Sequence, residues 1–130
     1  MPREYVKGDE PEGRGYSPAV VTQGGKHVWL AGVTRVEDEE GKSLAGDFEG
    51  QAHAIFRQIG RVLERVGGKM EDIVVMTVFI LDARFDDRFV GVRKHYFKDK
   101  FPGSALIQVA GFDHPDNLLE VQAIAVVGDE

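Results

Sequence analysis

Three polar side chains stand inside two C-terminal segments that otherwise resemble apolar strands. Glu120 and Gln122 interrupt the apolar run 118–127, and Gln108 interrupts the run 101–110. Side chains of a strand alternate between its two faces, so Glu120 and Gln122 share one face. Burying a carboxylate is costly unless it has a partner or meets a wet cavity. Glu120 is therefore a candidate for general acid–base or binding work, while an exposed sheet face explains the same pattern.

The chain lacks the residues that several other kinds of catalysis require. The chain has no cysteine, which excludes disulfides and thiolate chemistry. Its four histidines show no spacing suited to a metal site, and the acidic run 37–40 is typical of a solvated turn. Gly24-Gly25 indicates a hairpin turn rather than a phosphate-binding loop. We therefore expect no metal and no cofactor.

The overall composition indicates one domain. The chain has 130 residues, of which 42% are hydrophobic and 29% charged, as in ordinary globular proteins. We expect an irregular N-terminal arm over 1–15 and a single domain over 16–130. The formal net charge of −6 argues against nucleic-acid binding. No run is long and apolar enough for a membrane span, and no signal peptide is evident, so we expect a cytoplasmic location.

The clearest predicted element is a helix over 48–66, whose apolar residues recur at spacings of three and four. Asp47 is its candidate N-cap, and Gly67-Gly68 ends it. Gln51 and His53 lie off the apolar stripe, so both are expected to face solvent.

The remaining pattern predicts strands and one more helix. The expected strands cover 19–23, 26–33, 71–81, 101–110 and 118–127, and the second helix covers 85–96. Strands 19–23 and 26–33 are predicted to pair as a hairpin, and the apolar run 71–81 is predicted to lie centrally. The order β-β-α-β-α-β-β predicts an α+β fold.

Several short strings of residues follow one another along the chain in a recognisable order. They are Tyr16-Ser17-Pro18-Ala19-Val20, Ala31-Gly32, the helix start Gly46-Asp47-Phe48-Glu49-Gly50-Gln51, the strand segments Asp72-Ile73-Val74 and Thr77-Val78-Phe79, then Phe101-Pro102 with Gln108-Val109-Ala110, and Glu120-Val121-Gln122-Ala123-Ile124-Ala125-Val126. Along 16–127 they resemble the RidA/YjgF family, also labelled endoribonuclease L-PSP-like.

The resemblance implies a chorismate-mutase-like α/β (α+β) sheet with two helices packed on one face. It also implies a homotrimer with pockets at subunit interfaces. Well-known members hydrolyse enamines and imines such as 2-aminoacrylate to 2-oxo acids and ammonia. By the same resemblance Glu120 is the catalytic residue that acts on water, and Tyr16 and Gly32 are kept as pocket residues.

This chain departs from the family at the substrate-binding positions. Ser104 stands where the family has an arginine that clamps the substrate carboxylate, and Arg93 replaces an asparagine on the second helix. Leu106 and Gln122 are further replaced positions that would line the pocket. A serine hydroxyl cannot form the two charge-assisted bonds of a guanidinium, so we expect weak turnover of 2-aminoacrylate.

The missing charge has three candidate sources, namely Arg35, Arg93 and an arginine of a neighbouring subunit. Arg93 follows the apolar stripe of its helix by one residue, which favours an ordinary surface position.

The sequence therefore leaves two main functions open. One is an enamine or imine deaminase, or a related hydrolase, that acts on a small molecule. The other is a non-catalytic small-molecule-binding or regulatory trimer of the same fold. A ribonuclease or translation inhibitor is suggested only by the family label, and the net charge of −6 argues against it. The expected partners are a small ligand and further copies of the chain.

Overall fold

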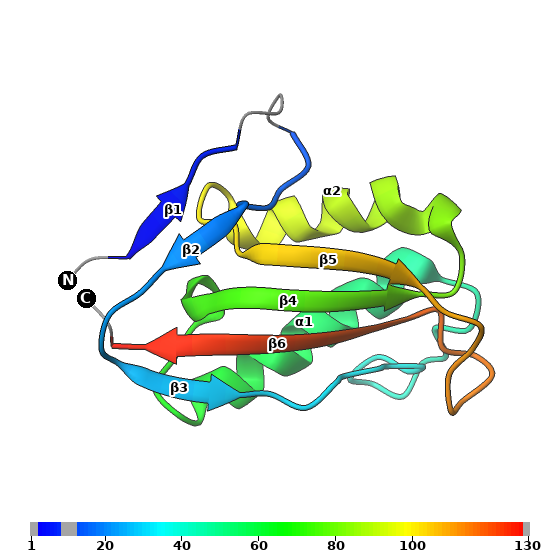
Figure 1. Cartoon of the computed structure of the whole chain (residues 1–130). Coiled ribbons are helices and arrows are strands. Elements are labelled where there is room, and N and C mark those ends of the chain that lie inside the picture. The colour runs from blue at the N-terminus through cyan, green and yellow to red at the C-terminus, as the bar shows by residue number, and fades with distance from the viewer. Residues whose placement is uncertain (1–2, 9–12, 129–130) are drawn as a thin grey trace.

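The computed structural model describes residues 3–8 and 13–128 as a two-layer α+β fold (Figure 1). Its elements are β1 (Glu4–Val6), β2 (Ala19–Val21), β3 (Lys26–Trp29), α1 (Phe48–Glu64), the short 3-10 helix η1 (Met70–Asp72), β4 (Ile73–Ile80), a second 3-10 helix η2 (Ala83–Phe85), α2 (Asp86–Phe97), β5 (Gly103–Gln108) and β6 (Leu119–Val127). The predicted fold class is confirmed.

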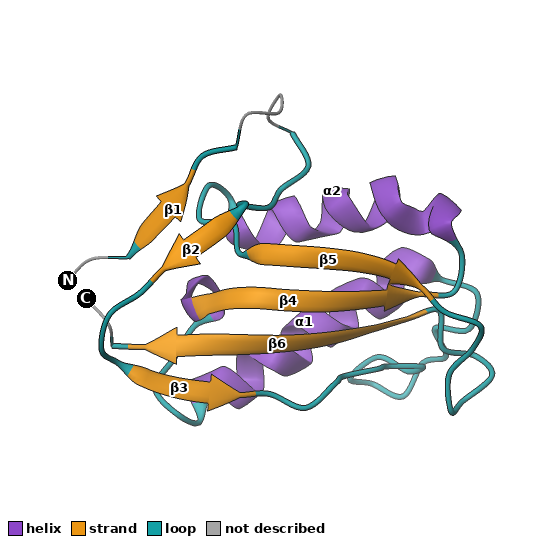
Figure 2. Ribbon diagram, in the orientation of Figure 1, coloured by secondary structure: helices purple, strands orange, loops and turns teal. Residues whose placement is uncertain are grey.

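The main sheet has the strand order β3-β6-β4-β5, so the two C-terminal strands are separated by β4. β6 runs antiparallel to β3 and to β4, whereas β4 and β5 are parallel. A parallel pair requires a crossover connection, and α2 provides it. Both helices pack on one face of this sheet, and the other face carries no helix (Figure 2).

The hydrophobic core lies between the helices and the sheet. It joins the apolar stripe of α1 to alternate residues of the strands, including Leu119, Val121, Ala123 and Ala125 of β6. They alternate with Glu120 and Gln122, which share the opposite face as predicted. The Asp47 side chain accepts a hydrogen bond from the Gly50 N–H at 2.9 Å, which confirms the predicted N-cap.

The predicted hairpin at Gly24-Gly25 is wrong. Both glycines do have positive φ angles, 72° and 80°, but they lead the chain from one sheet to another. β2 pairs with β1 in a separate two-stranded sheet, and β3 pairs with β6. β1 also corrects the expectation of a wholly irregular arm, because Glu4–Val6 forms a strand. Residues 1–2 and 9–12 of that arm lie outside the described part of the chain.

Gln51 is fully buried, contrary to the prediction that it faces solvent. Its Nε2 donates to the carbonyls of Leu44 and Asp116 at 3.0 and 2.9 Å, and its Oε1 accepts from the Leu118 N–H at 2.9 Å. Gln51 thereby satisfies backbone groups of two loops, which explains a polar side chain in the core. His53 is half-buried, with its Nδ1 2.8 Å from the Tyr96 hydroxyl.

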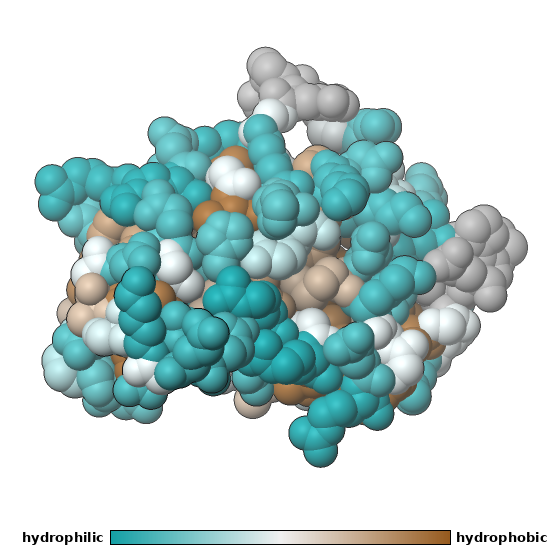
Figure 3. All heavy atoms as spheres, turned by 180° about the vertical axis from the view of Figure 1, so that it is seen from behind, coloured by the Kyte–Doolittle hydropathy of each residue, from teal (hydrophilic) through white to brown (hydrophobic). Residues whose placement is uncertain are grey.

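The two sides of the molecule have different surfaces. From the helix side the surface is mainly hydrophilic (Figure 3). The face of the sheet without helices exposes large apolar side chains, and they include Trp29 at 73%, Ile107 at 42% and Val75 at 38%. No helix in the described ranges is long and apolar enough to cross a membrane.

Candidate functional site

The candidate site residues fall on opposite faces of the main sheet. Ser104 of β5 pairs with Met76 of β4, and Glu120 of β6 pairs with Phe79 of β4. Met76 is buried in the core beneath the helices. Paired residues share a face and residues three apart in one strand do not. Ser104 therefore faces the helices, and Glu120 faces the open side of the sheet.

The open-face cluster consists of Gly32, Glu120 and Gln122. The Val33 N–H donates to the Val121 carbonyl at 2.9 Å and the Val121 N–H returns a bond at 3.1 Å, which holds Gly32 beside Glu120. A Cβ on Gly32 would lie 2.1 Å from Glu120 Oε2, so any other residue at position 32 would displace this carboxylate. Glu120 is half-buried and Gln122 is exposed.

The carboxylate of Glu120 has no hydrogen-bond or ion-pair partner within residues 3–8 and 13–128. A half-buried carboxylate without a protein partner can accept a proton or bind a donor group. A cavity of about 220 Å³ lies on the same face, and its lining includes Gln122, Thr77 and Trp29. Gln122 lines this cavity, whereas Glu120 lies two residues before it on the same face of β6 and outside its lining.

Gln51 is a positioning residue that reasoning about the helical stripe missed. Its bond to the Leu118 N–H lies two residues before Glu120 and secures the start of β6. The helix-start string that ends in Gln51 carried the signal, because it is one of the strings that resemble the family.

The helix-side cluster consists of Arg93, Ser104 and the arm segment 14–16. Arg93 is 3% exposed, so its predicted surface position is wrong. Its Nη1 donates to Ser104 Oγ at 2.6 Å and its Nη2 donates to the Arg14 carbonyl at 2.8 Å, while its Nε has no acceptor in the described part of the chain. Arg93 lies four residues from both Phe89 and Phe97, which are buried, and this spacing places it on the buried side of α2.

The electrostatic setting of Arg93 is unusual for a buried cation. Its acceptors are a hydroxyl and a carbonyl, and its guanidinium carbon lies 5.2 Å from the centroid of the Phe89 ring. Burial, with the nearby Arg14 charge, lowers the pKa of the Arg93 guanidinium to about 10. The group therefore remains charged at neutral pH without a carboxylate among its hydrogen-bond partners in the described chain.

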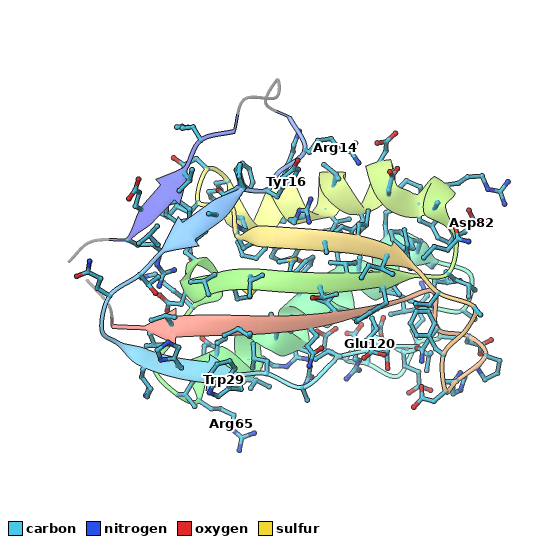
Figure 4. The ribbon with its side chains drawn as sticks, viewed as in Figure 1. Arg14, Tyr16, Trp29, Arg65, Asp82 and Glu120 are labelled. Atoms are coloured by element: carbon cyan, nitrogen blue, oxygen red, sulfur yellow. The ribbon has the colours of Figure 1, made fainter. Side chains whose placement is uncertain are left out.

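Tyr16 belongs to the arm segment of the helix-side cluster and lies near Arg14, far from Glu120 (Figure 4). The following Ser17 attaches the arm to the start of β5, with its N–H donating to the Pro102 carbonyl at 2.9 Å and its hydroxyl to the Phe101 carbonyl at 2.7 Å. Tyr16 itself is 44% exposed. The structure thus brings Tyr16, Arg93 and Ser104 into one region and Gly32, Glu120 and Gln122 into another.

The other candidate residues have local explanations. Leu106 is partly buried against the core, on the same face of β5 as Ser104. Arg35 donates to the carbonyls of Glu37 and Asp38 in its own turn. Gln108 accepts a hydrogen bond from the Ala83 N–H at 2.6 Å, so its partner lies within the chain. Arg93 is thus the candidate arginine that contacts Ser104.

Comparisons with known proteins agree with this fold. The sequence profile described as Endoribonuclease L-PSP matches residues 8–127. A RutC family protein of Aquifex aeolicus is 31% identical over 112 residues, which cover 85% of this chain and 87% of that protein. The human 2-iminobutanoate/2-iminopropanoate deaminase is 26% identical over 113 residues, which cover 87% of this chain and 80% of that protein.

A solved structure gives the same result for the fold. YyfB from Yersinia pestis, of the conserved Rid protein family, superposes with a TM-score of 0.84. The match covers 98% of this chain and 100% of that chain at 18% identity.

Proposed function

Because the chain belongs to the RidA/YjgF family, also described as Endoribonuclease L-PSP, we propose that it hydrolyses the C=N bond of a small imine or enamine-derived substrate. The 26% identity to a 2-iminobutanoate/2-iminopropanoate deaminase supports this reaction class. We further propose that the site forms between copies of the chain in a homotrimer.

The contact between Glu120 and Gly32 carries this proposal. The carboxylate occupies the space where any other residue at position 32 would place its Cβ, and the described chain offers it no partner. A carboxylate kept for structure alone would be expected to accept bonds from neighbouring donors. Glu120 instead remains available to a water molecule or a ligand.

The reaction needs one group that moves protons, and Glu120 can serve. Glu120 takes a proton from water while the water oxygen bonds to the imine carbon, and it gives that proton to the imine nitrogen, which yields a neutral carbinolamine. Glu120 then takes the hydroxyl proton as the C=O bond forms and passes it to the nitrogen as the C–N bond breaks. The products are ammonia and a carbonyl compound, so atoms and charge balance. Such proton transfer contributes roughly 10²–10⁴-fold to a rate.

The placement of the two clusters supports an inter-subunit site. Within one chain Glu120 and Ser104 are on opposite faces of the sheet, so one copy cannot bring both to one ligand. The open face also exposes Trp29, Val75 and Ile107, which a second copy would cover. A cyclic trimer joins unlike surfaces of successive copies and so could join the two clusters.

The test is ammonia release from freshly generated 2-iminobutanoate. Glu120→Gln should lower turnover by roughly 10²–10⁴-fold. Glu40→Gln, in an exposed turn, is the matched control and should have wild-type turnover. Equal turnover in the wild type and Glu120→Gln would exclude Glu120 as the acid–base group, and a monomer in sedimentation equilibrium would exclude the inter-subunit site.

A non-catalytic binding function is the second candidate, and Ser104 at the position of the family arginine favours it. Such a protein would bind a small ligand but release no ammonia above the uncatalysed rate. In that case Glu120→Gln would alter ligand affinity alone.

A further inference from the structure

We propose that Arg93 is the anion-binding residue of this protein and holds a ligand carboxylate side-on through Nε and Nη2. The arm segment 14–16 covers this position and must move away for the ligand to bind. The substrate class that follows, a small 2-imino or 2-oxo acid, rests on the proposed function, whereas the carboxylate site does not.

The three nitrogen atoms of Arg93 differ in a way that fits a carboxylate. Nη1 is occupied by Ser104 Oγ at 2.6 Å, which orients the guanidinium. Nε is buried and has no acceptor within residues 3–8 and 13–128, and Nη2 donates to the Arg14 carbonyl at 2.8 Å. Nε and Nη2 form one edge of the planar guanidinium, and two parallel bonds to a carboxylate can form along such an edge. The Arg14 carbonyl takes one of those two places.

The burial of Arg93 is the reason why its unpaired Nε donor points to a ligand. A buried charged group needs a paired charge or a full set of hydrogen bonds, because desolvation otherwise opposes its ionised form. Arg93 is 3% exposed, and its acceptors are a hydroxyl and a backbone carbonyl. A bound carboxylate would supply both the missing acceptor and the missing negative charge.

The guanidinium reaches Ser104 from α2 rather than from β5. In the family resemblance the arginine stands at position 104 itself, and here the helix residue brings its charge to within 2.6 Å of that position. Ser104→Arg would place a second guanidinium against Arg93. The variant should therefore interfere with Arg93 rather than restore a clamp.

The arm segment that covers Arg93 is suited to displacement. Gly15 is buried with a φ of 74°, and a Cβ there would lie 3.6 Å from Arg93 Nε. Arg14 attaches the segment to α2 through ion pairs with Asp86 and Asp87, and these groups are largely exposed. Exposed ion pairs contribute little free energy, so the Arg14 ion pairs add little to the cost of lifting the segment, and a bound carboxylate would replace the Arg14 carbonyl on Nη2.

A cationic cavity lies directly beside the same segment. Its volume is about 650 Å³, and Gly15 and Tyr16 belong to its wall. Among the described residues its charged lining residues are Lys7, Arg14, Lys94, Lys98 and Asp99, and Arg14 is paired with Asp86 and Asp87. The three lysines provide positive charge next to the segment that covers Arg93.

The test uses calorimetric titration with 2-oxobutanoate, the oxo acid that hydrolysis of 2-iminobutanoate yields. Arg93→Gln and Arg93→Lys should weaken binding by about tenfold or more, because both lose the planar fork. Ser104→Ala, which removes only the bond that orients Nη1, should weaken it by a smaller factor. Arg88→Gln, on the same helix but paired with Glu49 at the surface, is the matched control and should bind normally.

The Gly15→Ala variant tests whether the arm segment 14–16 can be displaced or is fixed. Alanine is disfavoured at a φ of 74°, so the covering conformation becomes less populated and binding of 2-oxobutanoate should tighten about fivefold. Saturating ligand should also speed amide hydrogen exchange at residues 14–16. Unchanged affinity in a folded Arg93→Lys variant would overturn the anion site. Weaker or unchanged affinity in Gly15→Ala would overturn the displacement of the arm.

Glu120→Gln distinguishes this proposal from the proposed function. It should bind 2-oxobutanoate without turning over the imine. Arg93-dependent binding in a wild type that releases no ammonia would refute the deaminase alone. Full turnover in folded Arg93→Lys would refute the anion site alone.

Discussion

The helix-side cluster and the open-face cluster differ in how the chain treats their polar groups. Arg93 is enclosed by α2, β5 and the arm, and two of its three nitrogen atoms have partners. Glu120 stands on an uncovered sheet face with no partner among the described residues. Folding of one chain thus encloses the first cluster and leaves Nε of Arg93 for a ligand, whereas the second cluster remains open to a ligand or to another copy.

The apolar side chains around the two clusters also differ, because those on the helix side are buried and those on the open side are exposed. The helix side of β4 is covered by α1 and α2, and Met76 and Val78 there are at most 1% exposed. On the open side Val75 is 38% exposed in the same strand. Removal of apolar surface from water drives both folding and association. We infer that the helix side stabilises the chain and that the open side is available for assembly.

The largest expected effect comes from mixing two variants, of which one carries a substitution in the helix-side cluster and the other a substitution in the open-face cluster. Arg93→Gln alone should lose about ten- to a hundredfold in kcat/KM, and Glu120→Gln about 10²–10⁴-fold. In a cyclic trimer each site would take one cluster from each of two copies. Subunit exchange between equal amounts should then restore about a quarter of wild-type turnover.

A mixture of Glu120→Gln with Glu120→Ala is the matched control, because both faults lie in the same cluster. It should recover no activity. If the Arg93→Gln and Glu120→Gln mixture also recovered none after verified subunit exchange, the two clusters would not form one site.

A matched pair of valines in β4 tests the two faces of the sheet. Val78→Ala should lower the free energy of unfolding by about 2–3 kcal/mol, since Val78 is fully buried beneath the helices. Val75→Ala, on the open face, should lower it by less than about 1 kcal/mol in dilute protein. Urea unfolding at two protein concentrations measures both losses, and the Val75→Ala loss should grow where the chain is assembled. Equal losses at low concentration would contradict this contrast between the faces.

Gly32→Ala tests the contact beneath Glu120. Its Cβ would lie 2.1 Å from Glu120 Oε2, so the carboxylate must move. We expect turnover to fall by about tenfold or more, since a misplaced acid–base group loses rate steeply. Gly91→Ala, in α2 with no atom within 4 Å of the new Cβ, is the control and should stabilise the helix by about 0.5–1 kcal/mol. Full activity in Gly32→Ala would show that the contact has no catalytic importance.

The smallest expected effect is spectroscopic. Trp29 is the single tryptophan of the chain and is 73% exposed on the open face. If other copies cover that face, its fluorescence should shift to shorter wavelength and acrylamide should quench it less in the assembled protein. The fluorescence is measured at protein concentrations through the dissociation range, and sedimentation at the same concentrations gives the state of assembly. Emission that stays solvent-exposed in a trimer would place the interface elsewhere.

Local patterns in the sequence were sufficient for the elements of the fold. The spacing of apolar residues predicted α1, Asp47 was identified as its cap, and alternation along β6 predicted that Glu120 and Gln122 share one face. These features depend on neighbours close in sequence, where helical and strand periodicities apply directly. The membership of the family also followed from short strings in order.

The arrangement of the candidate site was decided by tertiary structure. Alternation within one strand orders that strand's side chains, but the face shared by two strands depends on their register, so the sequence could not separate Ser104 from Glu120. The hairpin prediction at Gly24-Gly25 was wrong for the same reason, because β1 and β6 provided the partners of β2 and β3. The burial of Arg93 depends on Arg14 and Ser104, which lie 79 and 11 residues away. Contacts at such separations form only when the whole chain packs, and they determine which charges meet.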